Sequence, residues 1–274
     1  LNQGQNFSRL MSFAMYGPKS PATNLLTEAE LTNMNPQELV DRIHNQNSYK
    51  HRILYYGPSS SKDLLATINQ YHQVPAALKD IPAGNEYAYL ETPVTKVLVA
   101  PYDAKQIYMA QISNLDKKYD PAIEPIRALY DEYFGGGMNS IVFQEMRETR
   151  GLAYSAWASI MPPSYLKYPY VLRTQIATQN DKMIDAVTTF NDIINNMPES
   201  EAAFKLAKDG LTNRLRTERI IKGDIIWSYI NAQDLGQNVD PRIKLYNDIQ
   251  NMSLKDIVDF QKQWVKGRTY VYCI

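Results

Sequence analysis

The order of the predicted strands and helices suits an α+β fold. Two pairs of strands, separated by a helix that opens at Asp120, are predicted to be hairpins: KVLVAPY and QIYMAQIS at 96–113, and the antiparallel pair LAYSAWASI and YPYVLRTQIAT at 152–178. They are predicted as strands because apolar and polar residues alternate in them. Helical segments follow at 181–265, and RTYVYCI at 268–274 closes the chain as a strand. Paired strands followed by a run of helices are typical of α+β proteins.

Length and composition narrow the class of protein. The 274 residues are enough for one large domain or two ordinary ones, and 44% of them are apolar. Lysine plus arginine and aspartate plus glutamate both number 29, which argues against a generally basic nucleic-acid binder. No stretch approaches the roughly 18 apolar residues of a membrane span, so none is expected. The single cysteine, Cys273, excludes an internal disulfide and is predicted to be a small buried residue.

Helices and one strand are predicted in the first part of the chain. An apolar stripe before Gly17 indicates a first helix, and it consists of Phe7, Leu10, Met11 and Met15. A capping box at Thr27 starts a second helix, and Asn35 caps a third that has proline at its first position. That third helix has an apolar face made of Leu39, Val40 and Ile43. HRILYYG at 51–57 is predicted to be a strand, residues 59–73 a helix and residues 74–93 a linker.

An internal repeat connects the two ends of the chain. MNPQELVD at 34–41 parallels MSLKDIVD at 252–259, and each runs into a basic segment and a strand, HRILYY at 51–56 and GRTYVY at 267–272. The helices are 218 residues apart and the strands 216. The repeat predicts that residues 1–75 finish one copy and that residues 76–274 form a complete second copy. The alternative is a chance similarity between two amphipathic helices.

The stretch at 134–160, FGGGMNSIVFQEMRETRGLAYSAWASI, reads as a glycine-rich loop, a short helix and a strand. Asn139 or Ser140 caps the helix, because a side-chain oxygen there accepts free backbone N–H groups. Gly151 ends the helix, since glycine takes the left-handed conformation without steric cost. The turn therefore brings Arg147, in the last helical turn, close to Tyr154, near the start of the strand.

GGGMNSIVFQEMRETRGLAYS at 135–155 resembles the C-terminal-type domain of the M16 zinc peptidases, the pitrilysin and insulysin family. The shared pattern is a glycine-rich segment, a serine before a short helix, an Arg-Glu pair and Gly-Leu-Ala-Tyr-Ser. The resemblance implies a mixed, largely antiparallel sheet with helices packed on one face. It also implies that residues 76–274 are a complete M16 C-terminal-type domain, preceded in residues 1–75 by the C-terminal part of a similar domain. Because the chain begins without methionine or a signal-peptide pattern, we interpret it as a fragment of a larger protein.

The resemblance implies that the zinc of the family lies outside this chain. In the family, an inverted His-x-x-Glu-His motif and a later glutamate hold the metal, and the glutamate of the motif is the general base. The three histidines, His44, His51 and His72, lie in no such motif. Asp41 and His44 share a helix face, but we interpret them as a solvated pair. We therefore expect no metal or cofactor in this chain, and zinc in a missing half or a partner.

Carried over to this sequence, the resemblance makes Arg147 and Tyr154 the residues that bind substrate near the zinc. A guanidinium and a phenol are donors that stabilise the charge on a scissile carbonyl oxygen in the tetrahedral intermediate. The alternative is structural, with Arg147 near the negative end of its helix and Tyr154 packed in the sheet. Phosphate binding is disfavoured, because no Gly-Lys-Ser/Thr follows the glycines at 135–137 and GPSSSK at 57–62 lacks the second glycine of a P-loop.

The leading functional hypothesis is the substrate-binding, non-zinc half of a zinc metalloendopeptidase. Such a half is inactive alone and positions peptides for a zinc-bearing half in the same parent chain or in a partner subunit. The alternative is a non-catalytic partner or scaffold subunit of M16-like fold, and an upstream His-x-x-Glu-His motif would distinguish the two. A third hypothesis, an unrelated α+β enzyme, predicts a pocket with its own acid–base pair away from Tyr154.

Overall fold

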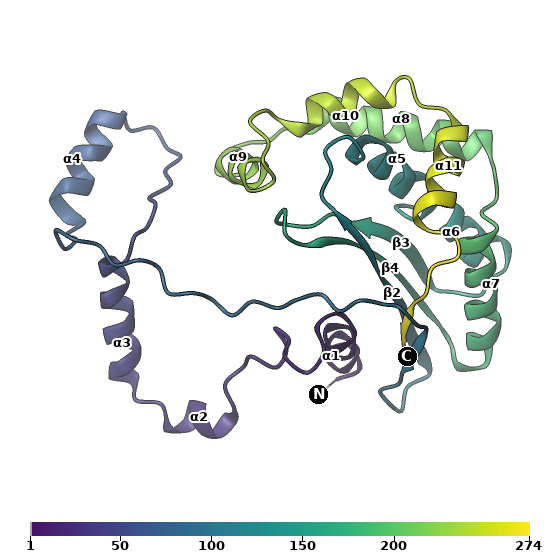
Figure 1. The fold of residues 1–274 in the computed structure, drawn as a ribbon, viewed down its shortest axis with the longest axis horizontal. Helices are drawn as coiled ribbons and strands as arrows, with labels where there is room; N and C mark the ends of the chain where they lie inside the picture. Colours follow the sequence, from purple (N-terminus) through teal and green to yellow (C-terminus); the bar gives the residue numbers. More distant parts are fainter. Residues whose placement is uncertain (1) are drawn as a thin grey trace.

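The computed structural model describes residues 2–274 and contains a five-stranded sheet with the order β1-β5-β2-β4-β3 (Figure 1). β1 pairs with β5 in parallel, and all other neighbours are antiparallel, so the predicted mixed, largely antiparallel sheet is confirmed. The strands are β1 Lys96–Leu98, β2 Gln106–Lys118, β3 Ser155–Met161, β4 Pro169–Gln179 and β5 Val271–Cys273.

One of the two predicted hairpins is correct. β3 and β4 pair from Ser155 to Met161, as predicted. β1 and β2 are not neighbours, because β5 from the end of the chain lies between them. Val271 and Cys273 of β5 are 6% and 0% exposed. An apolar strand buries more of its surface between two neighbouring strands than at the edge of a sheet. Burial of apolar surface therefore favours the central position of β5.

Most helices lie on one face of the sheet, as predicted (Figure 1). Met109 of β2, Ile160 of β3 and Leu172 of β4 point to this face and are fully buried with Leu129 and Ile257 of the helices. Burial of each such side chain stabilises the fold by about 1.5–3 kcal/mol. The helices are α5 Glu124–Phe134, α6 Ile141–Phe143, α7 Met183–Asn195, α8 Glu201–Thr217, α10 Pro241–Ile249 and α11 Leu254–Trp264, with α9 Asp224–Asp234 beyond their layer.

A single helix, α1 Gln3–Tyr16, packs on the opposite face of the sheet, over β2 and β5. Its side chains Phe7, Met11 and Ala14 are buried in a cluster with Ile112 and Cys273. This confirms the burial predicted for Cys273 and the apolar stripe predicted for the first helix. α1 therefore attaches the start of the chain to the sheet, and not every helix lies on one face.

Residues 18–95 form an arm between α1 and the sheet (Figure 1). The arm contains α2 Glu28–Asn33, α3 Pro36–Asn45 and α4 Ser61–Tyr71, and none of these helices buries a residue. The predicted caps are confirmed, because the side chains of Thr27 and Asn35 accept the backbone N–H groups of Glu30 and Gln37.

The predicted strand at 51–56 is wrong for this chain. These residues form no strand, and the arm has one isolated bridge, between Tyr49 and Lys79. A strand needs neighbours for its backbone N–H and C=O groups, and within residues 2–274 none lies beside 51–56. The corresponding part of the second copy of the repeat, which includes Val271, pairs with both β1 and β2.

The helices of the repeat show the same contrast. Leu39 and Val40 of α3 are 47% and 40% exposed, whereas Ile257 and Val258 of α11 are 0% and 9% exposed. The two pairs are 218 residues apart, which is the spacing of the repeat. The two segments therefore carry similar apolar patterns, but within residues 2–274 only the face on α11 is buried.

Candidate functional site

The loop after α5 leads through three glycines into a capped helical turn. The Oγ of Ser140 accepts the backbone N–H of Phe143 at 3.4 Å and donates to the carbonyl of Gly137 at 2.6 Å, so Ser140 is the cap. The helix continues after α6 as one turn of π-helix, η2 Gln144–Thr149. Gly151 follows with φ 58°, the conformation predicted for it. π-helical turns are rare and occur frequently at functional sites.

The turn places Arg147 and Tyr154 side by side, as the sequence predicts. The guanidinium carbon of Arg147 lies 5.6 Å from the centre of the Tyr154 ring and 5.1 Å from the centre of the Phe143 ring. Such a contact is worth about 0.5–1 kcal/mol at an exposed site, enough to favour one orientation of the arginine. The backbone N–H of Tyr154 donates to the carbonyl of Ala177 in β4 at 2.8 Å, which holds the tyrosine at the start of β3.

Both side chains are open to a ligand. Tyr154 is 71% exposed, so it does not fit the alternative of a packed strand residue. The Nε of Arg147 lies 3.6 Å from Glu148, in a pair whose side chains are 45% and 53% exposed. An exposed pair of this kind contributes roughly 0–1 kcal/mol and is easily exchanged for another acceptor. The guanidinium and the phenol together form a patch of hydrogen-bond donors.

The outer edge of β3 is closed by α5. Asp131 accepts the backbone N–H of Ile160 at 2.8 Å and the hydroxyl of Ser159 at 2.9 Å, and Arg127 donates to the carbonyl of Ile160 at 3.0 Å. Burial raises the pKa of Asp131 to about 6, although Arg127 and the two hydrogen bonds act to lower it. α5 therefore covers this edge at Ser159 and Ile160. Arg147 and Tyr154 lie at the beginning of β3 and are exposed.

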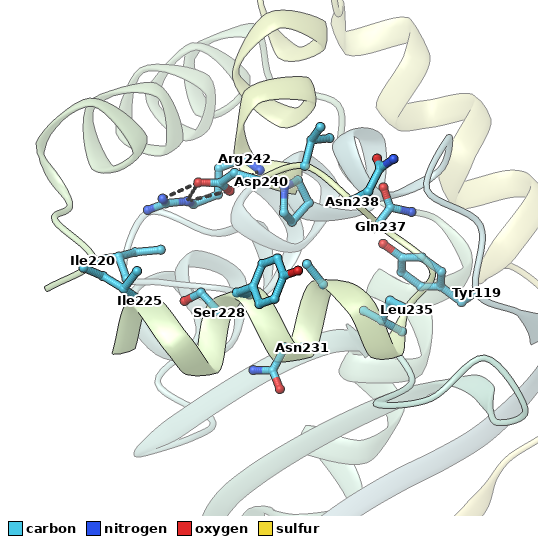
Figure 2. A pocket seen from close by; sticks show the side chains of 14 residues that line it. Tyr119, Ile220, Ile225, Ser228, Asn231, Leu235, Gln237, Asn238, Asp240 and Arg242 are labelled. Atoms are coloured by element: carbon cyan, nitrogen blue, oxygen red, sulfur yellow. Dashed lines mark hydrogen bonds and ion pairs between the residues drawn. The ribbon is translucent and has the colours of Figure 1, made fainter. Parts of the chain in front are cut away.

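A concave surface, which the sequence did not predict, lies between α9 and the loop after it (Figure 2). Its volume is about 560 Å³, within the range of ligand sites, and Ile225, Ala232 and Leu235 line it. Figure 2 shows Asp240 and Arg242 paired at one end and Tyr119 at the other. Hydrogen bonding to Arg242 lowers the pKa of Asp240, which makes it a poor general acid. This lining favours apolar groups, and it does not supply the acid–base pair of an unrelated enzyme.

The three histidines, His44, His51 and His72, all lie in the arm. Residues 2–274 contain no group of three or more histidine, cysteine, aspartate or glutamate side chains that could hold a metal ion. Asp41, which shares a helix face with His44, accepts a hydrogen bond from Gln37 at 2.8 Å. His51 and His72 lie together, with their Nε2 atoms 2.7 Å apart. A sequence motif could not predict this pair, because its two members are 21 positions apart in the sequence.

Residues 53–211 match the family model described as the peptidase M16 inactive domain. The fold is similar to the crystal structure of a peptidase M16 inactive domain from Pseudomonas fluorescens, with a TM-score of 0.69 at 16% identity. It is also similar to a conserved protein from Enterococcus faecalis, with a TM-score of 0.71 at 16% identity. A third similar structure is the ferredoxin protease FusC in complex with Arabidopsis ferredoxin, with a TM-score of 0.66 at 13% identity.

These similarities cover nearly all of this chain and only part of the others. Each alignment includes 99% of the chain, but 65%, 64% and 30% of the three solved chains, in the order given above. At such identities the structural likeness establishes the fold. No curated protein sequence gave a match. Within residues 2–274, no helix has both the length and the apolar character needed to cross a membrane.

Proposed function

Because the chain belongs to the M16 peptidase family, through the inactive domain of that family, we propose that residues 76–274 bind an extended polypeptide and position it for cleavage by a zinc-bearing half. The observation that carries the proposal is the exposed pair of donors, Arg147 and Tyr154, at the start of β3. The donor set of residues 2–274 does not fit a zinc site of three protein ligands. The zinc therefore belongs, in this proposal, to another part of the parent chain or to a partner subunit.

The proposed role of the pair is to bind the scissile carbonyl oxygen. Negative charge develops on that oxygen when a nucleophile adds to the carbonyl carbon, and the Tyr154 hydroxyl and the Arg147 guanidinium donate hydrogen bonds to it. The contacts of the guanidinium with the rings of Phe143 and Tyr154 orient these donors before substrate arrives, so little reorganisation is needed. A second half that covers the site would exclude water and strengthen both interactions.

Tyr154→Phe tests this role. With the zinc-bearing half present, the variant should lower kcat for a fluorogenic peptide by about 100-fold, the lower range for loss of one such donor, because only the hydroxyl is removed. Tyr165→Phe is the matched control, since Tyr165 is also exposed, at 50%, and lies on the loop between β3 and β4. Its turnover should equal that of the wild type.

A folded Tyr154→Phe variant with unchanged turnover would show that the assigned role is wrong.

The second candidate function is a non-catalytic partner or scaffold subunit. The family model is compatible with this candidate as well, because the matching domain is described as inactive. An intact parent protein without zinc-dependent peptide cleavage would support this candidate. The ferredoxin bound in the FusC structure extends the substrate class proposed for this chain from peptides to proteins.

We also propose that residues 1–75 are the C-terminal part of a preceding domain of the same fold. The exposed apolar face of α3 supports this, because its counterpart on α11 covers a sheet. In the parent protein, the backbone amides at 51–56 should then enter a sheet and exchange hydrogen more slowly than in this chain alone, by about tenfold or more. The amides at 271–273 should be protected in both. Equal exchange at 51–56 would contradict the proposal.

A further inference from the structure

Two histidines of the arm are arranged as an imidazole pair. His51 follows the isolated bridge at Tyr49, and His72 is the first residue after α4. Their Nε2 atoms are 2.7 Å apart, and the planes of the two rings meet at 88° with their centres 4.9 Å apart. The two rings therefore meet through their Nε2 atoms, and at this distance one Nε2 donates a hydrogen bond to the other.

A backbone contact fixes the tautomer of one ring. The Nδ1 of His51 lies 2.6 Å from the carbonyl oxygen of Tyr49. A carbonyl oxygen accepts hydrogen bonds and donates none, so the proton of the neutral imidazole is on Nδ1 and the lone pair is on Nε2. Histidines that ligate metals almost always donate their other ring N–H in this way, which orients the ring and raises its basicity.

We propose that His51 and His72 form a binding site for a divalent transition metal, with Zn²⁺ as the probe. Two imidazole nitrogens at the usual 2.0–2.1 Å from a tetrahedral zinc are about 3.3 Å apart, so the rings must separate by only about 0.6 Å from the present contact. Because the Nε2 of His51 has the lone pair, the Nε2 of His72 carries the proton in the present contact. On metal binding, this proton moves to the Nδ1 of His72. Within residues 2–274 no third protein ligand joins the pair, so water or an outside donor completes the coordination.

The chemistry of the pair selects the class of metal. Imidazole suits zinc, nickel and copper, whereas magnesium and calcium take oxygen ligands, which this pair lacks. The site is independent of the function proposed for Arg147 and Tyr154, because it lies in the arm. A bound ion would close a loop from His51 to His72 and attach the end of α4 to the segment that follows Tyr49. Metal binding is therefore expected to protect residues 52–71 against proteolysis.

Calorimetric titration of the 274-residue chain with ZnCl₂ tests the proposal. Wild type should bind one equivalent, and His51→Ala and His72→Ala should each lose more affinity than the roughly 10- to 100-fold that removal of an outer-shell partner costs. His44→Ala is the matched control, because His44 is the third histidine and lies on α3. It should bind as the wild type does, and MgCl₂ should give no saturable binding.

Two results would overturn the proposal. One is the absence of saturable zinc binding to the wild type. The other is binding that survives His51→Ala and His72→Ala or that falls equally in His44→Ala. Limited proteolysis provides a second measurement on the same variants: zinc should slow cleavage within residues 52–71 in the wild type and in His44→Ala, but not in His72→Ala. Since both rings lie on the unpacked arm, neither substitution removes a core contact.

Discussion

Replacing Gly135 by alanine should lower the free energy of unfolding by about 3 kcal/mol or more, the upper part of the range for overpacking. A Cβ at this position would lie 2.2 Å from the carbonyl oxygen and 2.4 Å from the backbone nitrogen of Ala158. These are backbone atoms of β3, so no side chain can rotate away. The strand itself cannot retreat, because it is paired with β4 along its whole length. Urea denaturation of both proteins measures the difference.

Gly137→Ala is the matched control, two residues further along the same loop. No heavy atom lies within 4 Å of a Cβ at Gly137. Its unfolding free energy should stay the same or rise by up to about 1 kcal/mol, because alanine reduces the entropy of the unfolded chain. If both variants lost the same stability, the loop would have a general need for glycine, and the close approach to β3 would not be the cause.

The three glycines show how far the sequence could predict this region. Their place before Ser140 was enough to predict a loop and a helix cap, because both depend on residues near in sequence. The neighbour that makes Gly135 necessary, Ala158, comes from another element, and nothing in the local pattern indicates it. The proximity of Arg147 and Tyr154 could be predicted from the sequence, because it depends on one local turn that ends at a glycine.

The same distinction, between local patterns and contacts with distant segments, explains the errors in the predicted fold. The sequence patterns correctly placed β1, β2, β3, β4 and β5, although β1 is shorter than predicted, but they did not give the order of the sheet. The insertion of β5 between β1 and β2 depends on pairing between the two ends of the domain. The strand predicted at 51–56 has a suitable sequence and no neighbour to pair with in residues 2–274. The pair of His51 and His72 was missed for a related reason, because it joins two segments of the arm.

Arg127→Met should lower the free energy of unfolding at pH 7 by about 3–5 kcal/mol, the usual cost of removing one partner from a buried ion pair. Arg127 lies between two carboxylates of α5, at 2.9 Å from Glu124 and 2.7 Å from Asp131, and its side chain is 12% exposed. Without the guanidinium, each carboxylate must either hold its negative charge away from water with no cation beside it or take up a proton. Arg214→Met is the matched control. Arg214 of α8 pairs at 2.9 Å with Glu132, which lies on α5 as Glu124 and Asp131 do, but the Arg214 side chain is 54% exposed. It should cost no more than about 1 kcal/mol.

The loss in Arg127→Met should also depend on pH, with a sign set by Asp131. Burial raises the pKa of this carboxyl in the folded protein to about 6, above its ordinary value of 3.8. The folded state therefore binds a proton more tightly than the unfolded state does, and the stability from this group is full below about pH 4 and is lost as the pH rises through about 6. Arg127 opposes that loss by favouring the carboxylate. Its removal should make the decline between pH 4 and 7 steeper, whereas Arg214→Met should follow the wild-type curve. Parallel curves for Arg127→Met and wild type would show that the charge of Asp131 is compensated by its other hydrogen bonds.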